Sequence, residues 1–366
     1  VNEMPADEAF TPTVYNDVQQ RLSVEDARIQ LNTSQYSRLP DLNASVGQSF
    51  NFGRGQGRNG VTEDRSSANT NFGINTSVPL FTGLRIPNQV RADRENVRAA
   101  EQTLEARRRE LTISLTAYFL NALNYRGRME VAAQKVSLDS MQVETARALV
   151  EQGKKAESEL FQAQAELASS HLQLTTAEGE YRRTLLDLCH AINWEGAEDY
   201  PVPAPLSESE DRELELRFID DASWIGLGVD NHPTVLAASH QLKGSVFQHK
   251  VARSAYFPTL GFSAGYSNSF FHSYGDDNLS FGEQLKLNGS EFISLSLQIP
   301  LFNRLGTRNN VRRAKLAITN RQLALDETRR SLRKQIEQAQ IDASNARARL
   351  RSALEAEKAN ELACQY

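Results

Sequence analysis

The sequence predicts an α+β membrane protein with two structural repeats, each made of a transmembrane β-hairpin and long coiled-coil helices. Three observations favour this class: an internal repeat, strand-length segments that alternate apolar with small polar residues, and long segments with a heptad pattern. No segment approaches the roughly 20 consecutive apolar residues that a membrane-spanning helix requires. We therefore expect any membrane crossing to use strands.

Two proline motifs anchor the internal repeat. Leu39-Pro40-Asp41-Leu42 recurs as Phe257-Pro258-Thr259-Leu260, and Val78-Pro79-Leu80-Phe81 recurs as Ile299-Pro300-Leu301-Phe302. The second pair is offset by 221 positions, and this offset also relates Asn88, Arg108 and Arg109 to Asn309, Arg329 and Arg330. Because the register holds downstream of the motifs, we interpret the chain as a duplication.

The first repeat is predicted to occupy residues 1–192. Its parts are a short helix at 14–36, a β-hairpin at 41–81, a long helix at 88–152 and a return helix at 156–192. The short helix should end before Pro40, since the residue that precedes a proline is disfavoured in the α region. Gly153 is predicted to take the left-handed conformation that ends the long helix, which makes an antiparallel helical hairpin with an exposed tip.

The rest of the chain is predicted to hold a connector and the second repeat. The connector, at 193–232, is acidic and contains several prolines, with a short helix expected at 208–221. The second repeat, at 233–366, should contain a short helix, a β-hairpin at 259–302 and a long helix at 307–366. The offset of 221 carries Gly153 to position 374, beyond Tyr366, so we expect this repeat to be truncated before its tip.

The four strand segments place apolar residues on one face and Ser, Asn and Gly on the other, the pattern of a transmembrane barrel. The side chains predicted to face the membrane are Val46, Phe50, Phe52, Phe72, Ile74, Val78, Phe262, Tyr266, Ile293, Leu295, Leu297 and Ile299. Four strands are too few to close a barrel, and an open edge leaves backbone groups unpaired in hydrocarbon. Several chains should therefore contribute strands. The segments 53–70 and 267–290 are predicted to be exposed hairpin loops.

Both long helices carry a heptad repeat. In the first, the residues that lie seven positions apart are Val90, Val97, Leu104, Leu111, Tyr118 and Tyr125. This period predicts a left-handed supercoil against neighbouring helices. A helix over 88–152 would be about 100 Å long at about 1.5 Å per residue, so its apolar stripe must face other helices.

Composition and motifs argue against several other functions. A net charge of −5 and a pI near 5.8 are unlike those of a nucleic-acid-binding protein. The six histidines are scattered without metal-ligand spacing, and the two cysteines, Cys189 and Cys364, support neither a disulfide framework nor a metal motif. No nucleophile elbow or phosphate loop is present, so we expect no enzyme activity, metal or cofactor.

The arrangement resembles the TolC-type outer-membrane efflux proteins over nearly all of the chain. The resemblance rests on the proline motifs that flank both hairpins, on Asn231-His232-Pro233 at the start of the second repeat, and on the helical tip. At the tip, the family pattern of Gly, Ser or Thr, an acidic residue and an aliphatic residue is met by Gly153, Ser158, Glu159 and Leu160.

This resemblance implies a homotrimer whose 12-stranded β-barrel, in outer-membrane lipid of a Gram-negative-type bacterium, continues into an α-helical tunnel in the periplasm. The connector would correspond to the equatorial region. The resemblance also implies an exit duct that works with a periplasmic adaptor and an inner-membrane pump in efflux or secretion. The adaptor would dock on the tip, at Gly153, Lys154, Lys155, Ser158 and Glu159.

A soluble or peripheral coiled-coil scaffold with a small β-head is the alternative that the sequence leaves open. A soluble β-sandwich also alternates apolar and polar residues, so the strand pattern does not separate the two classes. The scaffold predicts that the apolar strand faces pack inward and that the protein is soluble without detergent. The channel predicts that these faces meet lipid, that extraction requires detergent, and that the protein conducts ions in planar bilayers.

Overall fold

The computed structural model describes residues 12–56, 61–64, 66–192, 194, 223–275 and 277–365. The short helix expected at 208–221 and most of the expected connector lie outside these residues. The chain forms two compact units, Val1–Val24 with Glu101–Thr234, and Glu25–Ala100 with Val235–Tyr366. The helical segments at 12–36 and 85–151 therefore each contribute to both units.

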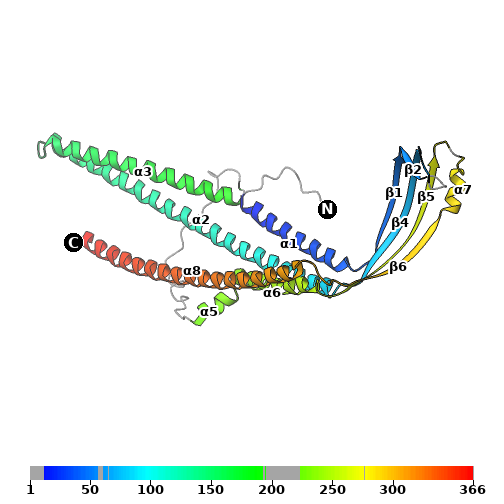
Figure 1. Cartoon of the computed structure of the whole chain (residues 1–366). Coiled ribbons are helices and arrows are strands. Elements are labelled where there is room, and N and C mark those ends of the chain that lie inside the picture. Colours follow the sequence, from blue (N-terminus) through cyan, green and yellow to red (C-terminus); the bar gives the residue numbers. More distant parts are fainter. Residues whose placement is uncertain are drawn as a thin grey trace. The chain divides into compact units, whose positions relative to one another are not determined.

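A four-stranded antiparallel sheet forms the β part of the second unit (Figure 1). Its strands are β1 (Asp41–Asn51), β4 (Ser67–Phe81), β5 (Thr259–Ser273) and β6 (Ser290–Gln298), in the order β1-β4-β5-β6. The hairpins β1–β4 and β5–β6 are thus joined side by side through β4 and β5. The single chain therefore has a β-hairpin and a long helix in each repeat, which confirms the predicted fold class.

Both hairpin loops contain regular structure that the sequence analysis did not predict. The first loop carries a small ribbon of β2 (Arg54–Gln56) and β3 (Thr62–Asp64). In the second, β5 extends to Ser273 and is followed by helix α7 (Phe281–Leu287). The hairpin loop predicted at 267–290 therefore begins later, after Ser273, and contains a helix. Ser280 caps α7 by accepting a hydrogen bond from the Glu283 backbone N–H, and the Glu283 side chain bonds back to the Ser280 N–H.

The helices follow the predicted order with small shifts at their ends. They are α1 (Pro12–Tyr36), α2 (Arg85–Glu151), α3 (Glu157–Ile192), α5 (Ser223–Asp230), α6 (Pro233–Ser254) and α8 (Gly306–Gln365). Helix α5, at the end of the expected connector, was not predicted. Helix α2 begins before the predicted position 88 because Pro87 lies in its first turn, where a missing N–H costs nothing. Pro233 likewise begins α6 directly after His232. No helix of the described residues is long and apolar enough to cross a membrane.

A tight turn connects each hairpin to its long helix. In the first repeat Gly83 and Leu84 have positive φ values of 61° and 66°. A side chain at Gly83 would clash, since a Cβ there would lie 2.7 Å from the Ser254 carbonyl oxygen and 2.8 Å from the Phe257 Cβ. Only glycine fits this close approach of the strand exit to the end of α6.

Small residues fill much of the helical core. The buried side chains of the described helices include Ala92, Ala99, Ala122, Ala146, Ala191 and Ala237. Many large apolar side chains on the same helices are exposed instead, among them Ile113, Leu138, Leu172, Leu316 and Ile341. A single chain therefore leaves extensive apolar helix surface in contact with solvent.

Candidate functional site: the sheet faces and the helical tip

The strand register places the four predicted apolar rows on the same face of the sheet. Val46 pairs with Phe72, Ile74 with Tyr266, and Phe262 with Leu295. Paired residues of antiparallel strands project to the same side, so each row continues the next. We call this side of the sheet the apolar face. Its large apolar residues include Leu42, Val46, Phe50, Phe72, Ile74, Val78, Leu260, Phe262, Tyr266, Ile293, Leu295 and Leu297.

Two of the predicted membrane-facing residues lie outside the strands. Phe52 follows the end of β1 and precedes Gly53, whose φ of 114° turns the chain. Ile299 follows the end of β6, because the next residue, Pro300, has no N–H to donate to a strand partner. Both are exposed, but their place on the apolar face is not fixed by strand pairing.

The apolar face is exposed in the single chain. The side chains of Leu42, Val46 and Ile293 are 75%, 74% and 78% exposed. The scaffold alternative predicts inward packing of these rows, and the exposure of these side chains contradicts it. A cluster of exposed apolar residues of this extent marks a surface that contacts lipid or other protein.

The opposite face carries small polar residues. Ser45, Gly73, Ser267 and Ser294 belong to its rows, and the hydroxyl oxygen of Ser45 would lie 3.3 Å from a Cβ at Gly73. Phe292 is an aromatic exception, and its ring lies over Gly265, where a Cβ would come within 2.7 Å of it. We call this surface the polar face. Its composition is typical of a surface that lines water.

The helical tip forms the turn between α2 and α3. The predicted tip residues Gly153, Lys154, Lys155, Ser158 and Glu159 are all exposed there. The N–H of Lys154 donates to the Leu149 carbonyl and that of Gly153 to the Val150 carbonyl, both at 2.9 Å. With a φ of 69° at Gly153, these bonds form the Schellman motif that ends a helix at glycine.

The tip also organises charge and a groove. The Lys155 ammonium lies 2.7 Å from the Glu159 carboxylate. Glu157 and Glu159 lie in the first turn of α3, where negative charge interacts favourably with the helix dipole. Beside them is a groove of about 350 Å³, whose lining includes Leu149, Lys155, Glu159 and Ala163. Two of the predicted tip residues, Lys155 and Glu159, therefore meet side chains of α2 at one concave surface.

Polar contacts hold the two helices of this hairpin together. Lys135 of α2 lies 2.9 Å from Glu166 of α3, and the buried Ser170 hydroxyl donates to the Asp139 carboxylate.

Cys189, near the end of α3, is a buried free thiol, and burial raises its pKa. Within the described parts of the chain, no three His, Cys, Asp or Glu side chains form a group that could hold a metal ion.

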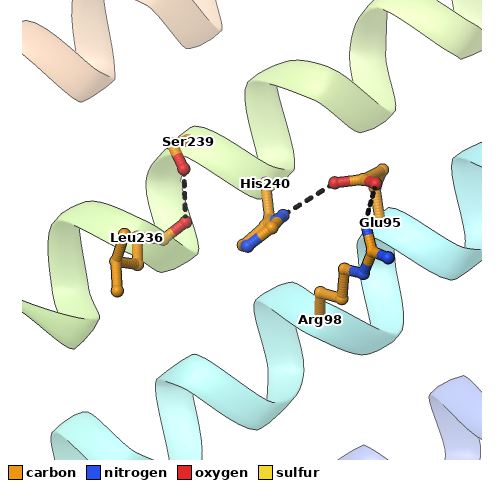
Figure 2. Close-up of polar contacts among 5 residues, drawn as sticks. All are labelled: Glu95, Arg98, Leu236, Ser239 and His240. Atoms are coloured by element: carbon orange, nitrogen blue, oxygen red, sulfur yellow. Dashed lines mark hydrogen bonds and ion pairs between the residues drawn. The ribbon is translucent and has the colours of Figure 1, made fainter. Parts of the chain in front are cut away.

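A buried carboxylate links the two repeats inside the second unit. Figure 2 shows Glu95 of α2 between His240 of α6 and Arg98. One oxygen of the Glu95 carboxylate lies 2.7 Å from Nδ1 of His240, and the other lies 2.6 Å from a guanidinium nitrogen of Arg98. Burial by itself would raise the pKa of Glu95. The hydrogen bond with His240 and the positive charges of Arg98, His240 and Lys243 outweigh this effect and lower the pKa.

This pair could not be predicted from the sequence, because Glu95 and His240 lie 145 positions apart and follow no local pattern. Helix α7 was not predicted either, although Ser280 and Glu283 have the spacing of a capping box.

Comparison with known proteins supports the fold and the family. A family model described as "Outer membrane efflux protein" matches residues 18–193 and 224–366. The chain is 25% identical to Protein CyaE of Bordetella pertussis over 335 residues, covering 90% of this chain and 65% of CyaE. It is 26% identical to the probable outer membrane lipoprotein SilC of Salmonella typhimurium over 313 residues, covering 81% of this chain and 60% of SilC.

The fold is also similar to a crystal structure of CusC, with a TM-score of 0.76 and 19% identity over 93% of this chain and 76% of that chain. The chain thus spans less than two thirds of the length of CyaE and SilC, at 65% and 60%. The family description and these relatives confirm the predicted outer-membrane location. With matched segments on both sides of the connector, the chain belongs to the outer membrane efflux protein family.

Proposed function

We propose that the chain assembles as a homotrimer into an outer-membrane channel, the exit duct of a tripartite efflux or secretion system. Each chain would contribute its four strands to a 12-stranded barrel and its long helices to a periplasmic tunnel. The function is conduction, without catalysis or a cofactor. A periplasmic adaptor would dock on the tip, and an inner-membrane pump would supply the energy.

The observation that carries this proposal is the strand register. It gives the sheet one exposed apolar face and one polar face. A barrel with lipid outside and water inside needs these two faces. The outer strands of the sheet, β1 and β6, leave backbone groups that closure with neighbouring copies would pair. The exposed apolar side chains on the long helices support the same assembly, since neighbouring helices would cover them.

A matched pair of adjacent substitutions tests the assignment of the faces. Ile293 projects from the apolar face and Ser294 from the polar face of β6. Ile293→Lys places a charge against lipid at a cost of about 2–4 kcal/mol near the bilayer midplane, so we expect it to abolish membrane-inserted trimer. Ser294→Lys adds the same side chain toward water and should assemble like the unsubstituted protein.

Heat-resistant oligomer on gels and the yield from outer-membrane extracts report the assembly of both variants. Equal assembly of the two variants, or loss with Ser294→Lys alone, would contradict the assignment of the faces.

A further inference from the structure

Helix α7 rests on the apolar face of the sheet. The Phe281 ring packs edge to face on Phe270 at 5.2 Å between centroids and on Phe72 at 6.3 Å. Phe72 pairs with Asn268, and Phe270 lies two residues further along β5, so both rings project to the apolar face. In Figure 1, α7 is the short yellow helix beside β5 at the loop end of the sheet.

Side-chain amides fasten α7 and its flanking loop to the backbone of β5. Strand β6 pairs with β5 only as far as Ser267. Beyond it, Asn288 donates to the Ser269 carbonyl, Gln284 bonds to both the N–H and the carbonyl of Phe271, and Asn278 does the same at Ser273. These bonds satisfy the strand edge where β6 has ended, and they fix the position of α7.

The apolar face changes character at the level of α7. Toward the helices its rows contain Leu42, Val78 and Leu297. Toward the loops they mix polar residues with aromatic ones, namely Gln48, Thr70, Asn268 and Glu291 with Phe50, Phe72 and Phe270. The Thr70 hydroxyl donates to Gln48, and the Asn268 amide donates to the Tyr266 hydroxyl at 3.0 Å. Polar groups and a tyrosine are typical of the depth at which hydrocarbon gives way to lipid headgroups.

Exposed apolar side chains occur at this level on α7 and on the residue just before its cap. They are Leu279, in the loop, and Phe281, Leu285 and Leu287, on α7; Leu287 is 71% exposed. Lys286 and Glu283 are also exposed and belong to the same helix. A short helix that combines apolar side chains with charged ones suits the boundary between acyl chains and headgroups.

We propose that α7 is an interfacial anchor that inserts Leu279, Leu285 and Leu287 among lipids at the headgroup boundary of the outer leaflet. This inference rests on the proposed function, because it requires the apolar face to contact lipid. The occupant is membrane lipid, since the helix surface is continuous with the lipid-facing rows and is held against them by Phe281. The anchor would fix the depth of the barrel in the membrane.

Quenching of introduced tryptophans by brominated lipid tests this inference. The purified protein carrying Leu287→Trp is reconstituted in vesicles of phosphatidylcholine brominated on its acyl chains, and the emission of the unsubstituted protein, which has two tryptophans, is subtracted. Leu279→Trp, in the loop directly before the cap of α7, provides a second reporter. Ile293→Trp, on the apolar face, reports whether the sheet itself contacts lipid. Val61→Trp, exposed in the first hairpin loop, is the matched control for a loop in water.

We expect bromolipid to quench the added emission of Leu287→Trp, Leu279→Trp and Ile293→Trp, and aqueous iodide to quench that of Val61→Trp. Quenching at Ile293→Trp without quenching at Leu279→Trp or Leu287→Trp would overturn the anchor and leave the channel proposal intact. Absence of quenching at Ile293→Trp would overturn the channel proposal and the anchor with it. Equal bromolipid quenching at Val61→Trp and Leu287→Trp would also overturn a special role for α7.

Discussion

Leu84 and Leu305, which lie 221 positions apart, adopt the same left-handed backbone conformation, with φ values of 66° and 64°. The carbonyl of each accepts a hydrogen bond from a backbone N–H four residues later, Asn88 at 3.2 Å and Asn309 at 3.0 Å. Each preceding residue, Gly83 or Arg304, also has positive φ. The duplication detected in the sequence is therefore preserved in the geometry of the turn from strand to helix.

Replacing these leucines with glycine should stabilise the protein. A left-handed conformation costs a non-glycine residue about 1–2 kcal/mol, and glycine avoids this cost. Glycine also has more conformational entropy in the unfolded chain, which offsets part of the gain in stability. Leu84 and Leu305 are largely exposed, so little apolar burial is lost. We expect Leu84→Gly and Leu305→Gly each to raise the free energy of unfolding by up to about 1 kcal/mol, measured by thermal unfolding in detergent. Leu84→Ala and Leu305→Ala are the controls, and stabilisation by alanine equal to that by glycine would contradict the explanation.

Two glycines with similar φ should respond differently to alanine. Gly83 and Gly153 have φ values of 61° and 69°, but a Cβ at Gly83 meets Ser254 and Phe257, whereas a Cβ at Gly153 meets no atom within 4 Å. Gly153→Ala should cost about 1 kcal/mol of backbone strain, and Gly83→Ala should cost more because the neighbouring backbone must also shift. Unfolding of the two variants gives the comparison. Equal losses would show that the close approach at Gly83 does not constrain the fold.

The strand rows were predictable because apolar and polar residues alternate with a period of two, which fixes the face of every strand residue once pairing is known. The turn at Leu84 and Leu305 was not, since leucine disfavours positive φ and no local motif signals it. In the first repeat, Gly83 in this turn lies close to Ser254 and Phe257, which are distant in the sequence. Ser280 and Glu283 did signal α7, but a helix of 7 residues is too short to show a helical period in the sequence. Pairing of Glu95 with His240 depends on helix packing that no local pattern encodes.

Glu95 should make a pH-dependent contribution to stability. Its folded-state pKa is lowered, so the stabilisation is complete above about pH 4.5, the ordinary pKa of glutamate, and is lost as the pH falls through the lower folded-state value. Glu95→Gln should lower the free energy of unfolding at neutral pH by about 1.5–3 kcal/mol, because the hydrogen bonds join charged groups. Unfolding of both proteins between pH 3 and pH 7 measures this difference.

The gap between Glu95→Gln and the unsubstituted protein should shrink below pH 4.5. Glu25→Gln, at an exposed carboxylate 3.9 Å from Arg28, is the control and should change stability little. A gap for Glu95→Gln that is constant with pH would contradict the charged hydrogen bond.

Charge reversal at the tip should impair adaptor docking without unfolding the hairpin. Lys154 and Lys155 are exposed, and the ion pair of Lys155 with Glu159 contributes little to stability at the surface. Lys154→Glu with Lys155→Glu should therefore reduce capture of a purified periplasmic adaptor in a pull-down while the oligomer persists. Lys334→Glu, on α8, makes the same kind of charge change away from the turn as a control. Undiminished capture by the double variant would exclude these lysines from docking.

Single-channel recording in planar bilayers tests the central claim, that the polar face of the sheet lines a water-filled path through the membrane. The purified protein should produce stepwise conductance. Ser294→Lys and Ser294→Glu should shift its ion selectivity in opposite directions, toward anions and toward cations, because the added charges face the lumen. Recovery of the protein as a detergent-free soluble monomer without conductance, or an unchanged selectivity in both variants, would contradict the account.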